Sequence, residues 1–544
     1  MTATSTAPPD ERFRWARRLI LLAVALAGIA HIAFLPPFEG FDESAHLSYI
    51  QQIADTGRIP RLGVDRISTD VEDYPGPHVL SMQIGKQDAG RVYRIFFGKP
   101  VPDLKQPVSR AYRPGVALNW QAQHPPLYYV LMTPFYRLAE NWSWPGHMLL
   151  LRLVSWAAAF AGLVIGMRAT EQVLSTLIVA PAAALLVPAW PLLFPEFFPE
   201  MARLGNDSLC LLLMGFAWRS VVRGLHDPDP KTAIGLGVSL GCGLLTKAFF
   251  WPIVAGCVAL FGLAWLQSRQ KRFLKFVAIA VGFTLVIGGW WYIRSLLTVG
   301  SFLGGAEFVQ ADQVGGILAR LSSGVGLDGI RVFLRGMAVI AGSFAWAGTW
   351  TLAMLPQIFT LPVVLLAALP LALWLARLRA LPVVGLAPLF LAAPFLAGLL
   401  YHVLGRAVGA YDAGTPGWYL HILAAPLALA VALGWRWRRF FAALVVYGIC
   451  FHLVCWATQL SLFSGCTYKP GPHMSLTLDP GSCLIVPSHL ATLGEPLLGS
   501  IALAAAAVAG FAGLFLAMRP TVVATLADVQ SGFARPEIPI KGSR

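Results

Sequence analysis

Long apolar runs dominate the pattern of hydrophobic and polar positions along this chain. The runs recur from Ala16 to Met518, and each is close to the ~20 residues that a helix needs to cross a bilayer. Short turns rich in arginine and lysine separate most of them, and a few polar stretches are much longer. The pattern predicts an all-α polytopic membrane protein with about 12 transmembrane helices, so the length of the chain means many helices and not several domains.

One apolar segment does not fit this series. Residues 124–139 (HPPLYYVLMTPFYRLA) are too few to cross a bilayer comfortably. Counting them as a span would move Arg168 and every later basic cluster to the other side of the membrane. We therefore expect an interfacial or re-entrant helix, a depth that suits its four aromatic side chains.

Composition and charge agree with a membrane protein. The 544 residues are 57% hydrophobic and 12% charged, whereas a soluble domain carries roughly a quarter charged residues. The formal charge of +14 does not indicate nucleic-acid binding, because the basic residues form small clusters at the ends of apolar runs. The positive-inside rule then puts both termini in the cytoplasm, with the clusters at Arg12–Arg18, Arg168, Arg219 and Arg223, Arg269–Lys275, Arg377 and Arg379, Arg436–Arg439, and Arg519.

This topology divides the chain into a cytoplasmic tail (1–16), a transmembrane domain (17–520) and a second cytoplasmic tail (521–544). The first apolar run follows basic residues, as in a signal peptide, but no small-x-small cleavage site follows it, so we expect a retained helix. Long loops should lie on the outer face at about 38–146, 295–356 and 463–496.

The seven cysteines do not have the spacing of a metal site. Five fall inside apolar helices, where buried thiols are ordinary. Cys466 and Cys483 share the last outer loop, which faces an oxidising compartment, so we predict a disulfide between them in preference to two free thiols.

The first loop begins with a cluster of polar residues. Asp42 resembles an N-cap residue, and the pattern from there to Gly57 predicts a partly amphipathic helix along the interface. Its N-terminus presents Asp42, Glu43 and, one turn on, His46. The two acids either cap the helix and favour its dipole or perform chemistry at the membrane surface, and physical reasoning alone leaves both readings open.

Several short motifs resemble the GT-C superfamily of membrane glycosyltransferases. The segments 41–46 (FDESAH) and 57–60 (GRIP) are similar to the first outer loop of these enzymes, and 123–129 (QHPPLYY) with 151–155 (LRLVS) is similar to a second marker. The superfamily includes protein O-mannosyltransferases and the lipid A aminoarabinose transferase. Residues 206–207 (ND), 245–247 (LTK), 290–294 (WWYIR) and 417–420 (GWYL) resemble a bacterial branch whose members are mostly unassigned.

The resemblance implies transfer of a sugar from a polyprenyl-phosphate donor to an acceptor lipid, glycan or protein, with inversion, at the periplasmic face of a bacterial inner membrane. Asp42 is then the expected general base, with Glu43 as the alternate or as the group that holds the acceptor. His46 would orient either acid. The expected partners are the donor, the envelope acceptor and membrane lipids, and not nucleic acid.

Cations near the outer face would stabilise the phosphate leaving group. Lys247 and Arg152 are the first choices, because a charge between apolar runs is costly unless it is in water or paired. Arg294 could instead snorkel beside tryptophans, and Arg203 could pair with Glu200. The full set of expected substrate-binding residues is His46, His124, Arg152, Arg203, Asp207, Lys247, Arg294, Arg406 and His421.

No cofactor is expected. Glu196, Glu200 and Asp42 would suit magnesium or manganese, but their spacing does not require a metal. Three other classes compete with a transferase: a transporter or lipid flippase, an O-antigen polymerase or ligase, and a scaffold without catalysis. A transporter usually has charges at mid-membrane and two related halves, and neither is evident in this sequence.

Overall fold

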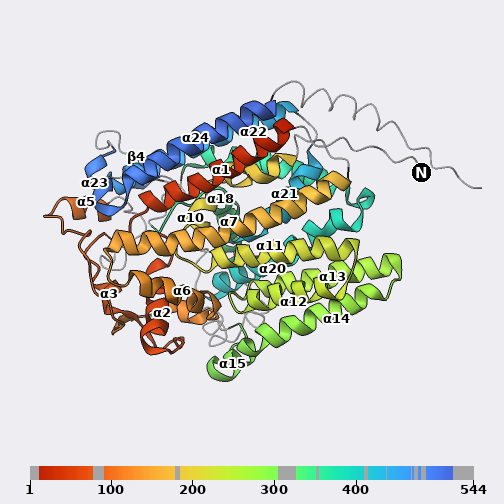
Figure 1. Cartoon of the computed structure of the whole chain (residues 1–544), viewed down its shortest axis with the longest axis horizontal. Coiled ribbons are helices and arrows are strands. Elements are labelled where there is room, and N and C mark those ends of the chain that lie inside the picture. The colour runs from red at the N-terminus through yellow and green to blue at the C-terminus, as the bar shows by residue number, and fades with distance from the viewer. Residues whose placement is uncertain are drawn as a thin grey trace, which may run out of the picture.

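The structure is a computed structural model that describes residues 11–77, 91–177, 184–303, 326–350, 355–409, 415–435, 438–466, 468–470, 476–478 and 485–518. This part of the chain is almost entirely helical (Figure 1). Its strands form two short antiparallel pairs, β1 (Arg66–Ser68) with β2 (Pro114–Leu118) and β3 (Tyr468–Pro470) with β4 (Leu476–Leu478). The all-α prediction is confirmed.

Ten helical segments of the described residues are long and apolar enough to cross a membrane. A polytopic membrane protein is therefore confirmed, whereas the count of about 12 is not. The segments lie in α1 (Glu11–Phe34), α7 (Trp144–Thr176), α11 (Asp207–His226), α13 (Phe250–Ser268), the continuous run of α14 (Arg272–Thr284), η2 (Leu285–Gly289) and α15 (Trp290–Val299), α19 (Gln357–Leu375), α20 (Val383–Gly409), η4 (Gly417–Leu423) with α21 (Ala424–Gly434), α22 (Arg438–Phe463) and α24 (Pro496–Met518).

Two shorter or less apolar helices, α12 (Pro230–Leu244) and α18 (Gly326–Ala345), complete the bundle. In Figure 1 the helices α24, α1, α7, α11, α12 and α14 lie side by side. The contact between α7 and α11 is very close, because a Cβ atom at Gly162 would lie 2.4 Å from the carbonyl oxygen of Leu211. A Cβ atom at Gly215 would lie 2.3 Å from the carbonyl oxygen of Gly162. Small residues allow such backbone contacts between membrane helices.

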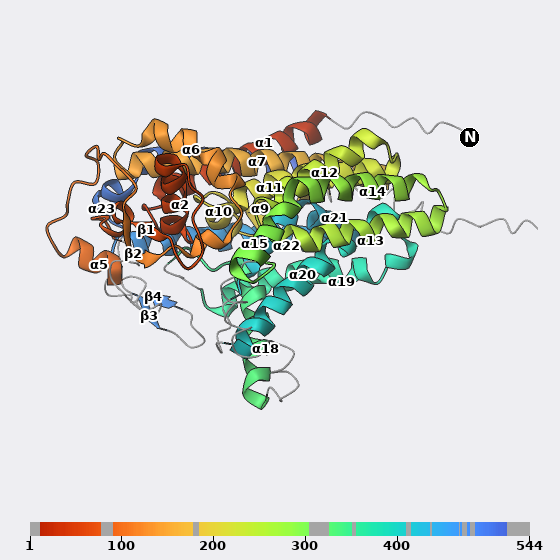
Figure 2. The same ribbon diagram turned by 90° about the horizontal axis from the view of Figure 1, so that it is seen from below.

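The first loop builds a separate cap at one end of the bundle. Its elements are α2 (Glu43–Thr56), α3 (Thr69–Glu72), α5 (Arg91–Phe97), η1 (Trp120–Gln123) and α6 (Leu127–Ala139), and α23 (Pro487–Leu493) lies beside them. Figures 1 and 2 show this cap at the end of the molecule opposite the N-terminus. Aromatic side chains such as Tyr49, Tyr93, Tyr129 and Trp144 fill its buried core, which is distinct from the core of the bundle.

Residues 124–139 behave as predicted in one respect. The helix α6 covers only 13 residues and is not among the ten candidate spans. It packs against α2 and α7. Its depth in a membrane remains a prediction.

Three of the basic clusters, at Arg168, at Arg219 and Arg223, and at 269–275, gather at the end of the bundle away from the cap. Helix α12 ends beside α6, because the Leu127 amide donates to the Leu245 carbonyl oxygen (3.1 Å). Helices α7, α11 and α13 therefore run away from the cap, and α12 and α14 return to it. Arg168, Arg219 and the cluster 269–275 then share the far end, as the positive-inside reading requires.

Cys466 is disulfide-bonded. Its predicted partner, Cys483, lies outside the described residues, so the pairing remains a prediction. The other five cysteines are free, as expected for thiols within helices.

Candidate active site at the first loop

Asp42 has an unusual backbone conformation, and its side chain makes few hydrogen bonds. It occupies the N-cap position of α2 in the left-handed region (φ 59°, ψ 10°), but its side chain makes no capping hydrogen bond. The Trp120 indole Nε1–H donates to Oδ1 (2.9 Å), and Oδ2 makes no hydrogen bond with any described residue. The capping explanation for this carboxylate is therefore wrong. A strained residue of this kind costs about 1 kcal/mol or more and is typical of functional sites.

Trp120 was not anticipated from the sequence. It begins η1, where the Asn119 side chain accepts the Gln121 amide (3.0 Å) and its Nδ2 donates to the Ala45 carbonyl oxygen (3.1 Å). This second bond ties η1 to α2 and so fixes the indole beside Asp42. Nothing in the local sequence indicates this contact, because the two side chains are 78 residues apart.

The surroundings of Asp42 favour a proton acceptor. Burial raises the pKa of Asp42, although Arg203, the Trp120 hydrogen bond and Lys247 oppose that effect. A carboxylate with a raised pKa holds a proton better near neutral pH, which suits a general base. Asp42 therefore combines an unpaired oxygen atom with increased basicity.

Glu43 has a different role from the one expected. Its Oε1 accepts from Arg152 Nε (2.7 Å) and the Leu204 amide (2.9 Å), and its Oε2 accepts from Arg152 Nη2 (2.5 Å) and the Gly40 amide (3.0 Å). The side chain is completely buried. With both oxygens occupied by charged and backbone donors, Glu43 is a structural anchor, and the alternate-base reading has no free oxygen to support it.

Arg152 is also committed to structure. Besides the bidentate pair with Glu43, it donates to the carbonyl oxygens of Leu35 (2.5 Å) and Pro36 (2.7 Å). Its exposed fraction is 1%. Arg152 thus ties α7 to the end of α1 and to the start of α2 with four of its five N–H groups, and its role in donor binding stays a prediction.

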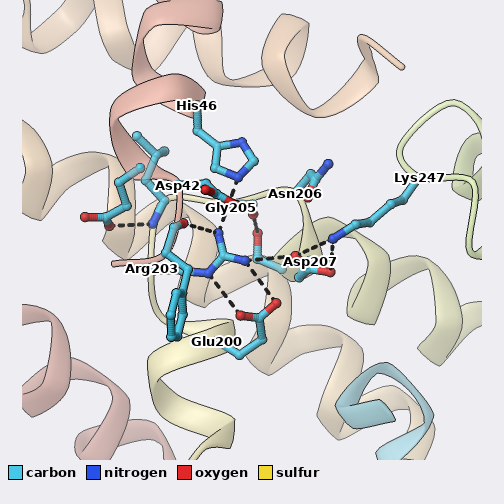
Figure 3. Close-up of polar contacts among 12 residues, drawn as sticks. Asp42, His46, Glu200, Arg203, Gly205, Asn206, Asp207 and Lys247 are labelled. Carbon is cyan, nitrogen blue, oxygen red and sulfur yellow. Dashed lines mark hydrogen bonds and ion pairs between the residues drawn. The ribbon is translucent and has the colours of Figure 1, made fainter. Parts of the chain in front are cut away.

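Arg203 forms the centre of a buried ion cluster (Figure 3). It donates to both Glu200 carboxylate oxygens (3.1 and 3.0 Å), to Asp207 Oδ2 (3.0 Å), to the Phe41 carbonyl oxygen (2.8 Å) and to His46 Nε2 (3.3 Å). These bonds use all five N–H groups of the guanidinium. The sequence also suggested that Arg203 could simply pair with Glu200, and this ion pair is present. Through its bonds to Phe41 and His46, Arg203 also holds the cap to the bundle.

The imidazole of His46 bonds to Arg203 and Tyr129, whereas the one bond of His46 to Asp42 among the described residues joins the two backbones (2.9 Å). Because a guanidinium can only donate, Nε2 accepts, and the imidazole proton lies on Nδ1 and is donated to the Tyr129 hydroxyl oxygen (3.0 Å). Burial, with Arg203 beside the ring, holds the pKa of His46 well below its usual range. The expectation that His46 orients Asp42 or Glu43 is therefore replaced by a neutral imidazole that orients Arg203.

Lys247 lies at the other side of the cluster (Figure 3). Its Nζ donates to both oxygens of Asp207 (2.8 Å each), and it lies 4.4 Å from the Tyr419 ring centroid and 4.9 Å from that of Phe249. An ammonium has three N–H groups, so one remains after the two bonds to Asp207. Lys247 and Asp207 therefore belong to the same ion cluster as Arg203, and their role in donor binding stays a prediction.

Arg294 lies over the Trp291 ring, 4.8 Å from its centroid, and is half-buried. Among the described residues it has no ion-pair partner. Its charge is felt at Tyr49, in the core of the cap, so the guanidinium lies at the end of the bundle that carries Asp42. Arg294 is thus a cation near the site without a committed carboxylate.

The other expected binding residues lie in ordinary surroundings. His124 accepts the Tyr49 hydroxyl through its backbone carbonyl (3.0 Å). His421 is buried against Phe344 and donates from Nε2 to the Phe344 carbonyl oxygen (3.0 Å), and its Nδ1 has no partner within the part of the chain that the structure describes. The side chain of Arg406 lies outside what the structure describes.

Among the described residues, no three His, Cys, Asp or Glu side chains are grouped as a metal site would require.

The chain matches no protein-family model and no curated protein. Among solved structures it is similar to ArnT from Cupriavidus metallidurans bound to undecaprenyl phosphate, with 14% identity, coverage of 84% of this chain and 77% of that chain, and a TM-score of 0.37. It is also similar to the archaeal oligosaccharyltransferase AglB from Archaeoglobus fulgidus in complex with an inhibitory peptide and a dolichol-phosphate, with 10% identity, coverage of 81% and 55%, and a TM-score of 0.37.

Both structural neighbours are membrane glycosyltransferases of the GT-C superfamily, the superfamily that the sequence motifs resemble. With TM-scores this low, the superpositions carry no argument about the chemistry of this chain.

Proposed function

We propose that this protein is a membrane glycosyltransferase that moves a sugar from a polyprenyl-phosphate donor to an acceptor, with Asp42 as general base. The reaction takes place where the first-loop cap meets the bundle, which we assign to the periplasmic face of the inner membrane. Asp42, Lys247 and Arg294 are the groups that act on the substrates.

The observation that carries this proposal is the contrast between Asp42 and the acids around it. Glu43, Glu200 and Asp207 are each held by one or two cations. Asp42 accepts one side-chain hydrogen bond from the described residues, that of Trp120, which leaves Oδ2 without a partner among them on a strained backbone. A carboxylate held in this way can take a proton from an acceptor without breaking an ion pair.

The reaction balances with the groups present. Asp42 removes the proton from the acceptor hydroxyl or amine as that atom forms a bond to the anomeric carbon of the sugar. The bond between the anomeric carbon and the phosphate oxygen breaks, and its electron pair stays on that oxygen. Attack opposite the leaving group inverts the anomeric carbon, and the products are the glycosylated acceptor, polyprenyl phosphate and a protonated Asp42.

Two cations fit the stabilisation of the leaving phosphate. Lys247 keeps one N–H group beyond its bonds to Asp207, and Arg294 makes no ion pair with any residue that the structure describes. Arg203 is less suited to this role, because all five of its N–H groups are bonded to buried partners. Arg152 is less suited because it is 1% exposed and four of its five N–H groups are bonded to buried partners. Cations aimed at the developing charge are the main source of stabilisation in reactions of this type.

The test is turnover of a panel of synthetic polyprenyl-phosphate sugars by purified protein in nanodiscs. Wild-type protein should consume at least one donor, and Asp42→Asn should lower the rate about 10²- to 10⁴-fold, the usual contribution of a general base. Asp73→Asn is the matched control, because Asp73 is an exposed acid of the same loop, and it should retain the wild-type rate.

Each other result has a definite meaning. Full activity of Asp42→Asn would remove Asp42 from the base position. Movement of intact lipid-linked sugar across the bilayer, with no donor consumed, would establish the transporter reading in place of the transferase.

A further inference from the structure

Two tryptophans form a parallel pair beside Asp42. The rings of Trp120 and Trp350 are 6.4 Å apart between centroids and differ by 11° in plane, and both residues are half-buried. Phe41 meets Trp350 edge to face (6.3 Å) and stacks on Trp418 (4.2 Å). Asp42, the proposed general base, thus lies beside a group of aromatic side chains that has no role in the proposed reaction.

The segment that carries Trp350 is held in place by two buried acids. The amides of Ala347 and Gly348 donate to Glu196 Oε2 (2.7 and 2.9 Å). Thr349 Oγ1 donates to Glu39 Oε1 (2.6 Å), and the Trp350 amide donates to the Glu39 carbonyl oxygen (2.8 Å). Glycine is required at 348, where φ is +86°. Four bonds on four successive residues therefore fix where Trp350 stands.

Trp120 is fixed just as firmly, because its indole N–H is donated to Asp42 Oδ1. Tryptophans at a membrane interface are often simple anchors, with the N–H turned to headgroups. Here the N–H of Trp120 points into the site, and the three residues before Trp350 are bound to buried carboxylates. The anchor explanation accounts for neither contact.

A sugar ring is the chemistry that such a pair recognises. One face of a pyranose presents carbon-bound hydrogens that carry partial positive charge, and the face of an indole is negative. Aromatic walls with a few polar groups are the usual lining of small-molecule sites. The general base must contact the acceptor. Because the Trp120 ring is bonded to Asp42, a ligand that stacks on this ring is the acceptor and not the donor lipid.

We propose that Trp120 and Trp350 form the acceptor subsite, and that the acceptor carries a sugar ring. This inference rests on the proposed function and deepens it, since it selects a glycan or glycolipid acceptor over a protein side chain. Trp350 is then a specificity residue that contacts the acceptor, and Glu39 and Glu196 position it.

The experiment compares acceptors with and without a ring, using the donor that wild type consumes. The acceptors are methyl glycosides of hexoses and pentoses, hexanol, and a serine-containing peptide. Trp350→Ala should raise the KM for methyl glycosides about 3- to 10-fold, as expected for loss of one aromatic contact, and leave the KM for the donor unchanged. Trp350→Phe should recover part of the loss. Trp142→Ala, at an exposed tryptophan after α6, is the control and should match wild type.

A second measurement does not depend on turnover. Saturation-transfer NMR should detect methyl glycosides on wild type and on Asp42→Asn, and the signal should fall in Trp350→Ala protein whose melting temperature is unchanged. An unchanged acceptor KM and NMR signal in Trp350→Ala, or wild-type preference for the peptide, would overturn the subsite while the transferase stands. Failure of wild type to consume any donor would overturn the proposed function itself, and glycosides that still bound through Trp350 would then mark a sugar-binding protein without transfer.

Discussion

In this site, the number of hydrogen bonds that each charged side chain makes distinguishes the residues that hold the fold from the residue that we propose to react. Arg203 uses all five of its N–H groups, and Glu43 accepts four bonds. Removing one partner from such buried sets is expensive, because the other is left charged in a dry interior. Asp42 accepts one bond, and so its carboxylate is the one whose loss should affect chemistry more than folding.

The raised pKa of Asp42 gives a prediction about pH. The base must be ionised, so donor turnover should fall as pH drops through the pKa of Asp42, and this acidic limb should lie above the usual range of an aspartate. The measurement is kcat/KM for the acceptor against pH, with the melting temperature followed in parallel. A limb at the ordinary pKa of an aspartate, or none between pH 4 and 8, would contradict the assignment.

The same shift has a consequence for stability with a definite sign. A folded-state pKa above the unfolded value means that the folded protein binds more protons between the two values, so its stability declines as pH rises through the folded pKa. Asp42→Asn removes that decline. The variant should therefore lose activity while melting no lower than wild type at neutral pH.

At this scale the sequence predicted part of the site. Asp42 and Glu43 were identified from their place at the membrane surface and from the motif around them, and Lys247 because a charge between apolar runs is costly. Asp207 was identified from its resemblance to a bacterial branch of the superfamily. Which of these residues hold the structure and which are free to act on a substrate could not be predicted. The bond from Arg152 to Glu43 joins residues 109 positions apart, and that from Trp120 to Asp42 joins residues 78 positions apart. Local pattern carries no information on such pairs.

At the scale of helices, the contact between α7 and α11 supports the site directly, since Asp207 begins α11 and Arg152 lies on α7. Gly162 and Gly215 allow the two backbones to touch. A shift between these helices would separate the Glu43–Arg152 pair from the Arg203 cluster.

Gly162→Ala should therefore destabilise the protein by about 1–3 kcal/mol, the usual cost of overpacking, and lower its melting temperature in detergent. Gly262→Ala on α13 is the control, because nothing lies within 4 Å of its added methyl group, and it should melt at the wild-type temperature or slightly above. Equal melting of both variants would show that the close contact is not required.

Helix existence was easier to predict than helix ends. Residues 124–139 were recognised as too short to span, and α6 has 13 residues. The helix after Asp42 was also predicted and ends at Gly57, whose φ is +67°. The left-handed start at Asp42 was not, because capping preferences assume an extended residue at that position. Tertiary contacts to Trp120 decided the outcome there.

At the scale of the molecule, the position of the cap and the distribution of basic residues both indicate which end of the bundle faces the periplasm. The cap, which contains α2, lies at the end of the bundle away from the N-terminus, and the turn between α13 and α14, which carries the basic cluster 269–275, lies at the other end (Figure 1). We expect a membrane-impermeant maleimide to label Asp73→Cys in intact spheroplasts, and Lys271→Cys only after the membrane is broken. Unsubstituted protein sets the background from native cysteines. The opposite labelling would place the cap, and with it the proposed reaction, in the cytoplasm.

The bonds that hold the 347–350 segment also set an order of assembly during synthesis. Glu39 cannot accept its bond from Thr349 until that residue has been made, 310 positions later. At a synthesis rate of about 5–20 residues per second, the delay is roughly 15 to 60 s. Throughout that time Glu39 keeps its bond from the Tyr93 hydroxyl (2.6 Å), but the wall that carries Trp350 does not yet exist. Under the proposed function, a nascent chain therefore gains its acceptor subsite only when nearly two thirds of it has been made, and we expect an immature protein to consume no donor lipid.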